Sequence, residues 1–146
     1  MHPLLLLGIG NTLRSDDGAG TYVCNQLQQL LLNNVTIETI QQLQTEHTEE
    51  WLKYDAVVVI DASVAATEVR IEKLEPGGNP VTSSHHINLS MMQALAQQLY
   101  NKQIQLYTCS IPAQNFEMGE TLSPFAKTHA DKAVQLLQQW ITFFSN

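Results

Sequence analysis

The sequence predicts a single α/β domain in which helices cover both faces of a twisted, mostly parallel sheet of about five strands. Three observations predict this three-layer α/β/α sandwich. Two short apolar runs, Leu4–Ile9 and Ala56–Ile60, have the composition of strands that are buried on both faces. Strand-like and helix-like segments alternate along the chain. The 146 residues, of which 44% are apolar, suffice for one domain over 1–146 and not for two.

Five segments are expected to form the sheet, with boundaries good to about two to four residues. They are residues 3–9, 35–40, 56–61, 68–74 and 104–109. In the fourth segment, charged residues alternate with Val69 and Ile71, which is typical of a half-exposed strand at the edge of a sheet.

Helices are expected in four segments, where apolar residues recur at helical spacing. They are residues 23–31, 46–53, 89–99 and a last helix that begins at Ser123–Pro124. Serine at the N-cap followed by proline in the first turn is a common start for a helix.

The composition argues against several classes of function. The net charge of -7 gives the chain no electrostatic attraction for nucleic acid. The N-terminal MHPLLLL has no basic region or cleavage site, so we expect no signal peptide. No apolar run approaches the roughly 20 residues that span a bilayer, so we expect a cytoplasmic protein without membrane insertion.

The two cysteines, Cys24 and Cys109, do not have the spacing of a metal site or a disulfide framework. They fall in an expected helix and an expected strand. We therefore predict that both are buried free thiols.

Three sets of polar residues lie next to predicted strands or helices, at positions where a ligand is expected to bind. Sites in open α/β sheets lie outside the carboxyl ends of the strands. Asp16–Asp17 follows the first strand, Asp61 ends the third, and His85–His86 precedes the third helix. Two carboxylates and one imidazole suit a borderline divalent metal such as nickel or zinc. Three protein ligands would leave positions open for a substrate.

Each of these residues also has a simpler interpretation. The aspartates at 16 and 17 are suited to helix capping, and Asp61 is suited to a turn after a strand. A dinucleotide site is disfavoured, because Leu13 stands where its third glycine belongs and the paired aspartates would repel a pyrophosphate. The sequence has no G-x-S-x-G elbow of a serine hydrolase.

Four segments in order resemble the motifs of the nickel–iron hydrogenase maturation endopeptidases. They are GIGNTLRSDDGAG, VVVIDAS, SSHHINL and IPAQNFEMGETLSP. The resemblance implies a phosphorylase/hydrolase-like α/β fold, with Asp17, Asp61 and His85 as the catalytic and metal-contacting residues. His85 is preferred to His86 because the following aliphatic residues then match the family's spacing, and Asp16 is then expected to be the helix cap.

The resemblance also implies a function. Members of this family, which is grouped with the aspartic-type endopeptidases, remove a C-terminal extension from the nickel-loaded large subunit of a hydrogenase. A pepsin-like aspartate pair is not evident in this sequence. Nickel would be supplied by the large subunit precursor, so no resident cofactor is expected, and the free enzyme is expected to be monomeric.

One segment departs from the family pattern. Thr39–Leu43 stands where many members have an Asp-Gly-Gly-Thr-like turn, which is thought to help choose the partner subunit. The departure leaves the identity of the hydrogenase open. Two alternatives remain at this stage: a non-catalytic, metal-sensing maturation chaperone and a small-molecule metallohydrolase.

Overall fold

The computed structural model describes residues 3–75 and 84–145, with the backbone alone over 84–88. Within this part of the chain, the strands are β1 (Leu4–Ile9), β2 (Val35–Ile40), β3 (Ala56–Ser63), β4 (Arg70–Leu74) and β5 (Leu106–Pro112). The helices are the 3-10 turn η1 (Ser15–Gly18), α1 (Ala19–Gln28), α2 (His47–Trp51), α3 (Ser84–Tyr100) and α4 (Pro124–Ser145).

The strands form one five-stranded sheet in the order β2-β1-β3-β5-β4. Four of them are parallel, and β4 pairs antiparallel with β5 at the edge. The predicted mostly parallel sheet and the predicted edge strand over 68–74 are therefore confirmed.

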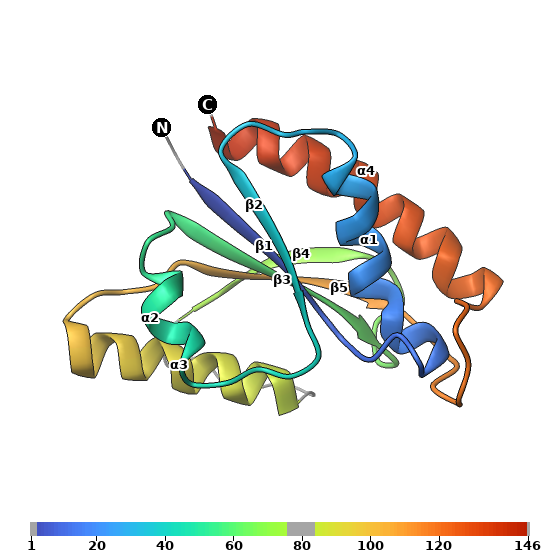
Figure 1. Cartoon of the computed structure of the whole chain (residues 1–146), viewed down its shortest axis with the longest axis horizontal. Helices are drawn as coiled ribbons and strands as arrows, with labels where there is room; N and C mark the ends of the chain where they lie inside the picture. Colours follow the sequence, from blue (N-terminus) through green and yellow to red (C-terminus); the bar gives the residue numbers. More distant parts are fainter. Residues whose placement is uncertain (1–2, 76–83, 146) are drawn as a thin grey trace.

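Both faces of the sheet are covered by helices. Alternate residues of β1 serve opposite faces: Leu4 and Leu6 pack in the core beneath α1 and α4. Leu5 and Leu7 pack with Trp51 of α2 and with the inner side of α3. Figure 1 shows α1 and α4 on one side of the sheet and α2 and α3 on the other. This double coverage explains why β1 is apolar at every position, and it confirms the three-layer sandwich.

Several boundaries differ from the predicted ones. Helix α1 ends at Gln28, so Leu31, predicted to lie on its apolar face, is instead 87% exposed. Strands β3 and β5 extend to Ser63 and Pro112, because these two ends continue to pair with each other. Helix α3 begins at Ser84, well before the first predicted helical residue. None of the described helices is long and apolar enough to cross a membrane.

Helix α1 lies unusually close to the carboxyl ends of β1 and β3. A Cβ atom on Gly20 would lie 2.4 Å from the Ile60 carbonyl oxygen, and one on Gly8 would lie 2.7 Å from the Gly20 carbonyl oxygen. The backbones can approach this closely only because neither residue has a side chain. This contact fixes the start of α1, and with it η1, against the end of β3.

We predict that Gly20→Ala lowers the free energy of unfolding by about 1–3 kcal/mol, the usual cost of overpacking. The loss should occur although alanine is favoured over glycine within a helix by about 1 kcal/mol. The control is Gly18→Ala, whose Cβ would meet the Cα of Thr12 at 3.3 Å and needs only a small adjustment. Urea unfolding measures both variants, and equal stability of the two would contradict the close approach.

Candidate functional site

The carboxyl edge of the parallel strands is where the chain assembles its polar groups. The opening loop, residues 10–18, follows β1 and includes η1, and the tail loop, residues 113–123, follows β5. Although about 100 residues separate them in sequence, the two loops lie side by side at this edge (Figure 1). The site is therefore built from both ends of the chain.

The opening loop depends on two unusual backbone conformations. Gly10 has φ of 149°, and a Cβ atom at this position would lie 1.9 Å from the carbonyl oxygen of Asp17. Ser15 has φ of 51°, a left-handed conformation that is uncommon for serine and costs about 1–3 kcal/mol. Together they turn the chain sharply from β1 into η1.

The tail loop holds this conformation through hydrogen bonds. Ser15 N–H donates to the Gly119 carbonyl at 2.8 Å, and Gly119 N–H donates to the Leu13 carbonyl at 2.9 Å. Asp16 N–H donates to the Asn115 carbonyl at 2.9 Å. The Ser15 hydroxyl also donates to the Glu117 carbonyl at 2.8 Å. These bonds offset the strain at Ser15.

The strongest link between the two loops is the carboxylate of Asp16, which is fully buried. Its Oδ2 accepts the N–H groups of Gln114 and Asn115 at 3.0 and 2.9 Å and the hydroxyl of Ser123 at 2.8 Å. Its Oδ1 accepts the N–H of Ser123 at 2.7 Å. Burial alone would raise the pKa of Asp16, but these hydrogen bonds favour the charged form and hold the pKa below its ordinary value.

The expectation that Asp16 is a helix cap is wrong. Helix α1 has Gly18 at its N-cap and no side-chain capping bond, and η1 has none either. The predicted cap of the last helix is confirmed, because the Ser123 Oγ accepts the N–H of Ala126 at 3.1 Å. Asp16 orients that same hydroxyl, so it supports the start of α4 from a distant part of the chain.

Asp17 occupies the exposed side of η1, next to the buried Asp16. Its side chain is partly buried, and its Oδ2 accepts the N–H of Asn11 at 2.8 Å. This bond fixes one oxygen of the carboxylate against the opening loop. Asp17 thus has a defined position at the carboxyl edge without being sealed in the core.

Asp61 lies within β3, which continues for two further residues to Ser63. The alternative that Asp61 merely forms a turn is therefore wrong. Its register partner is Ser110 of β5, and it directly follows Ile60, whose carbonyl contacts α1. Because η1 packs next to β3, Asp17 and Asp61 come from neighbouring elements at the same edge of the sheet.

His85 lies in the first turn of α3 rather than in a loop before it. Helix α3 leads to the amino end of β5, so its own first turn lies toward the opposite, carboxyl edge (Figure 1). The side chains of His85 and His86 lie outside the described residues. The convergence of His85 with the two aspartates therefore stays a prediction, and no group of three metal-binding side chains occurs among the described residues.

A surface hollow of about 430 Å³ adjoins the opening loop. Its walls come from the opening loop, from α1 and from the end of β2: Gly10, Asn11, Thr12, Leu13, Thr21, Thr39, Ile40 and Gln41. Asn11 belongs to this wall and also binds Asp17, so the hollow lies beside that carboxylate. Residues 39–41 belong to the segment that departs from the family pattern, and their place in the wall of a hollow was not predicted from the sequence.

The cysteines have the predicted character. Cys24 and Cys109 are both free and fully buried, and burial raises the pKa of each thiol to about 12. At neutral pH neither forms the thiolate that binds metals or attacks substrates. Neither cysteine therefore supplies a thiolate to the candidate site.

No protein-family model matches this sequence, and neither does the sequence of any curated protein. Solved structures do match. The hydrogenase maturating endopeptidase HybD from E. coli superimposes with a TM-score of 0.75 at 20% identity, over 92% of this chain and 89% of that one. This chain has the fold of a hydrogenase maturation endopeptidase.

Two archaeal proteins with this fold agree over nearly their whole lengths. The [NiFe] hydrogenase maturation protease HybD from Thermococcus kodakarensis gives a TM-score of 0.74 at 22% identity, over 94% of this chain and 98% of that one. The protease HycI from Thermococcus kodakarensis KOD1 gives 0.69 at 22% identity, over 94% and 91%. The match therefore extends well beyond the central sheet.

We predict that Asp16→Ala lowers the free energy of unfolding by at least about 3 kcal/mol. It leaves three partly buried backbone N–H groups without their acceptor, each costing about 1 kcal/mol or more. A lost helix cap would cost only about 1 kcal/mol. Urea unfolding distinguishes these values. The control Asp131→Ala removes an exposed carboxylate bonded to Tyr22 and Lys127 and should cost less than about 1 kcal/mol.

The lowered pKa of Asp16 also predicts an acid dependence of stability. A carboxylate whose pKa is lower in the folded state contributes stability above its unfolded pKa of about 3.9. That contribution is lost as the pH falls through the folded value. We expect urea midpoints of the Asp16→Asn variant to fall less steeply below about pH 4 than those of the parent. Parallel curves would contradict the charged state of Asp16.

Proposed function

We propose that this chain is an endopeptidase that removes the C-terminal extension of a nickel-loaded nickel–iron hydrogenase large subunit. The observation that carries the proposal is the position of Asp17 and Asp61. Both occur in motifs that resemble those of the maturation endopeptidases, and both come from neighbouring elements at the carboxyl edge of a sheet with that same fold.

The carboxylates and the imidazole would bind the nickel that the precursor carries. Asp17 has one oxygen fixed by Asn11, and Asp61 is held in a paired strand, so neither has to be ordered when a substrate binds. His85, from the first turn of α3, would complete the oxygen and nitrogen ligands that suit nickel. Peptide hydrolysis then needs a water placed at the scissile carbonyl and a carboxylate that accepts its proton.

The hollow beside the opening loop is suited to receive the chain around the cleavage site. It is open to solvent and lined by side chains and backbone of the opening loop and the end of β2. Gln41 belongs to the segment that replaces the family's glycine-containing turn, so this wall would contact the precursor and contribute to the choice of hydrogenase.

We expect Asp17→Asn, Asp61→Asn and His85→Ala each to lower processing of the matched precursor at least about 100-fold, the usual contribution of a positioned acid–base group. Circular dichroism and urea unfolding should show that the variants stay folded. His86→Ala is the control and should be milder. Equal losses from His85→Ala and His86→Ala would contradict the choice of ligand.

We further expect cleavage to require nickel in the precursor and the purified enzyme to retain little metal after dialysis. A resident catalytic metal needs ligands held by a supporting shell of hydrogen bonds, and a three-ligand site at a loop edge binds free ions weakly. The measurement compares cleavage of nickel-loaded and nickel-free large subunit and determines the metal content of the enzyme. Efficient trimming of the nickel-free precursor would overturn the nickel requirement.

The same assay separates the alternative functions. A metal-sensing chaperone would bind the nickel-loaded subunit and leave its tail intact. A small-molecule metallohydrolase would retain a stoichiometric metal through dialysis and ignore the precursor. Either result would overturn the proposed activity.

A further inference from the structure

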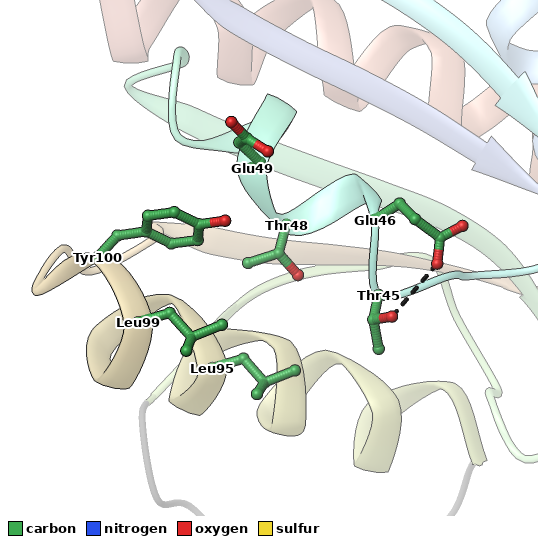
Figure 2. Close-up of a pocket in the computed structure, with 7 residues that line it drawn as sticks. All are labelled: Thr45, Glu46, Thr48, Glu49, Leu95, Leu99 and Tyr100. Atoms are coloured by element: carbon green, nitrogen blue, oxygen red, sulfur yellow. Dashed lines mark hydrogen bonds between the residues drawn. The ribbon is translucent and has the colours of Figure 1, made fainter.

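A second hollow lies between α2 and α3, on a face of the molecule that the proposed cleavage does not use. It has a volume of about 320 Å³ and is lined by residues of both helices and of the turn before α2: Thr45, Glu46, Thr48, Glu49, Leu95, Leu99 and Tyr100. Figure 2 shows Leu95 and Leu99 pointing from α3 toward Thr48 of α2. We call this hollow the α2–α3 groove.

The groove contains a buried hydroxyl that is not satisfied by the described residues. Thr48 is only 4% exposed, and its Oγ1 has no hydrogen-bond partner in the part of the chain that the structure describes. Its side chain points from α2 toward α3 (Figure 2). A buried hydroxyl without a partner is costly, so the packing of α2 on α3 is not fully satisfied at this point. Because the Oγ1 atom is itself shielded from solvent, a molecule bound in the groove does not reach it.

The remaining groups of the groove are acidic on one side and apolar on the other. Glu49 on α2 and Glu46 directly before it are exposed, and the seven lining residues include no lysine or arginine. Leu99 and Tyr100 on α3 are 66% and 42% exposed. Large exposed apolar side chains beside a rim of charges are typical of a surface that contacts another molecule.

The apolar side extends beyond the groove along α3. Met91, Leu95 and Leu99 are spaced four residues apart and therefore lie on one face of the helix. Met91 is 57% exposed. With a rise of 1.5 Å per residue, the stripe is about 12 Å long. This length is greater than the size of a small cation and matches that of a short peptide.

We propose that the α2–α3 groove and this stripe bind a cationic, amphipathic helical segment of a partner protein. Its aliphatic side chains would pack on Leu95 and Leu99, and its lysine or arginine side chains would lie against Glu46 and Glu49. Helices of this kind bind through apolar positions three and four residues apart. The proposal does not depend on the peptidase activity.

The probe is a synthetic peptide of about 15 residues built from Leu, Ala and Lys, a length at which such peptides begin to form a helix. It is titrated into isotope-labelled protein and followed by amide chemical shifts. We expect the shifts to concentrate in residues 45–50 and 91–100. A peptide with Glu in place of Lys should not bind, and spermine should bind more weakly than the Lys peptide because it lacks apolar side chains.

The variants test each part of the groove. Glu46→Gln combined with Glu49→Gln should weaken binding of the Lys peptide about tenfold. The matched control, Glu68→Gln with Glu72→Gln, removes the same charge from β4 and its approach, where both carboxylates pair with Arg70, and should leave binding unchanged. Thr48→Val should leave binding unchanged, because the Oγ1 atom is shielded from the groove.

Four results would overturn the proposal. Shifts spread over the whole acidic surface would show unspecific attraction, and equal weakening by the control pair would show the same. Equal binding of spermine would show that the apolar stripe takes no part. Self-association in sedimentation that Leu99→Ser abolishes would show that the occupant is a second copy of this chain.

Discussion

The buried carboxylate of Asp16 is the constraint on which the candidate site depends. A fully buried charge is stable only when hydrogen-bond donors surround it, and all four donors to Asp16 come from residues 114–123. One side chain thus joins the opening loop, the tail loop and the start of α4. Asp17 is its neighbour in η1, so the position of this partly buried carboxylate follows from the burial of the adjacent one.

The local sequence was sufficient to predict those features of the fold whose physical cause is local. The apolar runs of β1 and β3 and the Ser123–Pro124 start of α4 depend on burial and on capping within one turn, and each was predicted at nearly the right residues. The role of Asp16 was not predicted, because its donors lie 98 to 107 residues away and capping rules consider only the next few residues. No short-range signal distinguishes a capping aspartate from one that holds a distant loop.

The candidate site likewise combines features that could be predicted from the sequence with features that could not. The edge of the sheet that holds Asp17 and Asp61 followed from the rule that ligands bind at the carboxyl ends of parallel strands. The hollow beside Asp17 did not, since it depends on how Gly10 and Ser15 turn the opening loop toward the end of β2. The α2–α3 groove likewise required the packing of two helices that are separated in sequence by two strands.

The link between the two loops has a consequence for biosynthesis. Asp16 leaves the ribosome 107 residues before Ser123, its last hydrogen-bond donor. At about 5–20 residues per second, the opening loop exists for roughly 5–20 s before its donors have been made. During that interval the hydrogen bonds that offset the strain at Ser15 cannot form, and the carboxylate of Asp16 lacks its donors. The last strand, β5, is therefore synthesised before the donors that fix Asp16, and the candidate site can form in full only once synthesis has reached the start of α4.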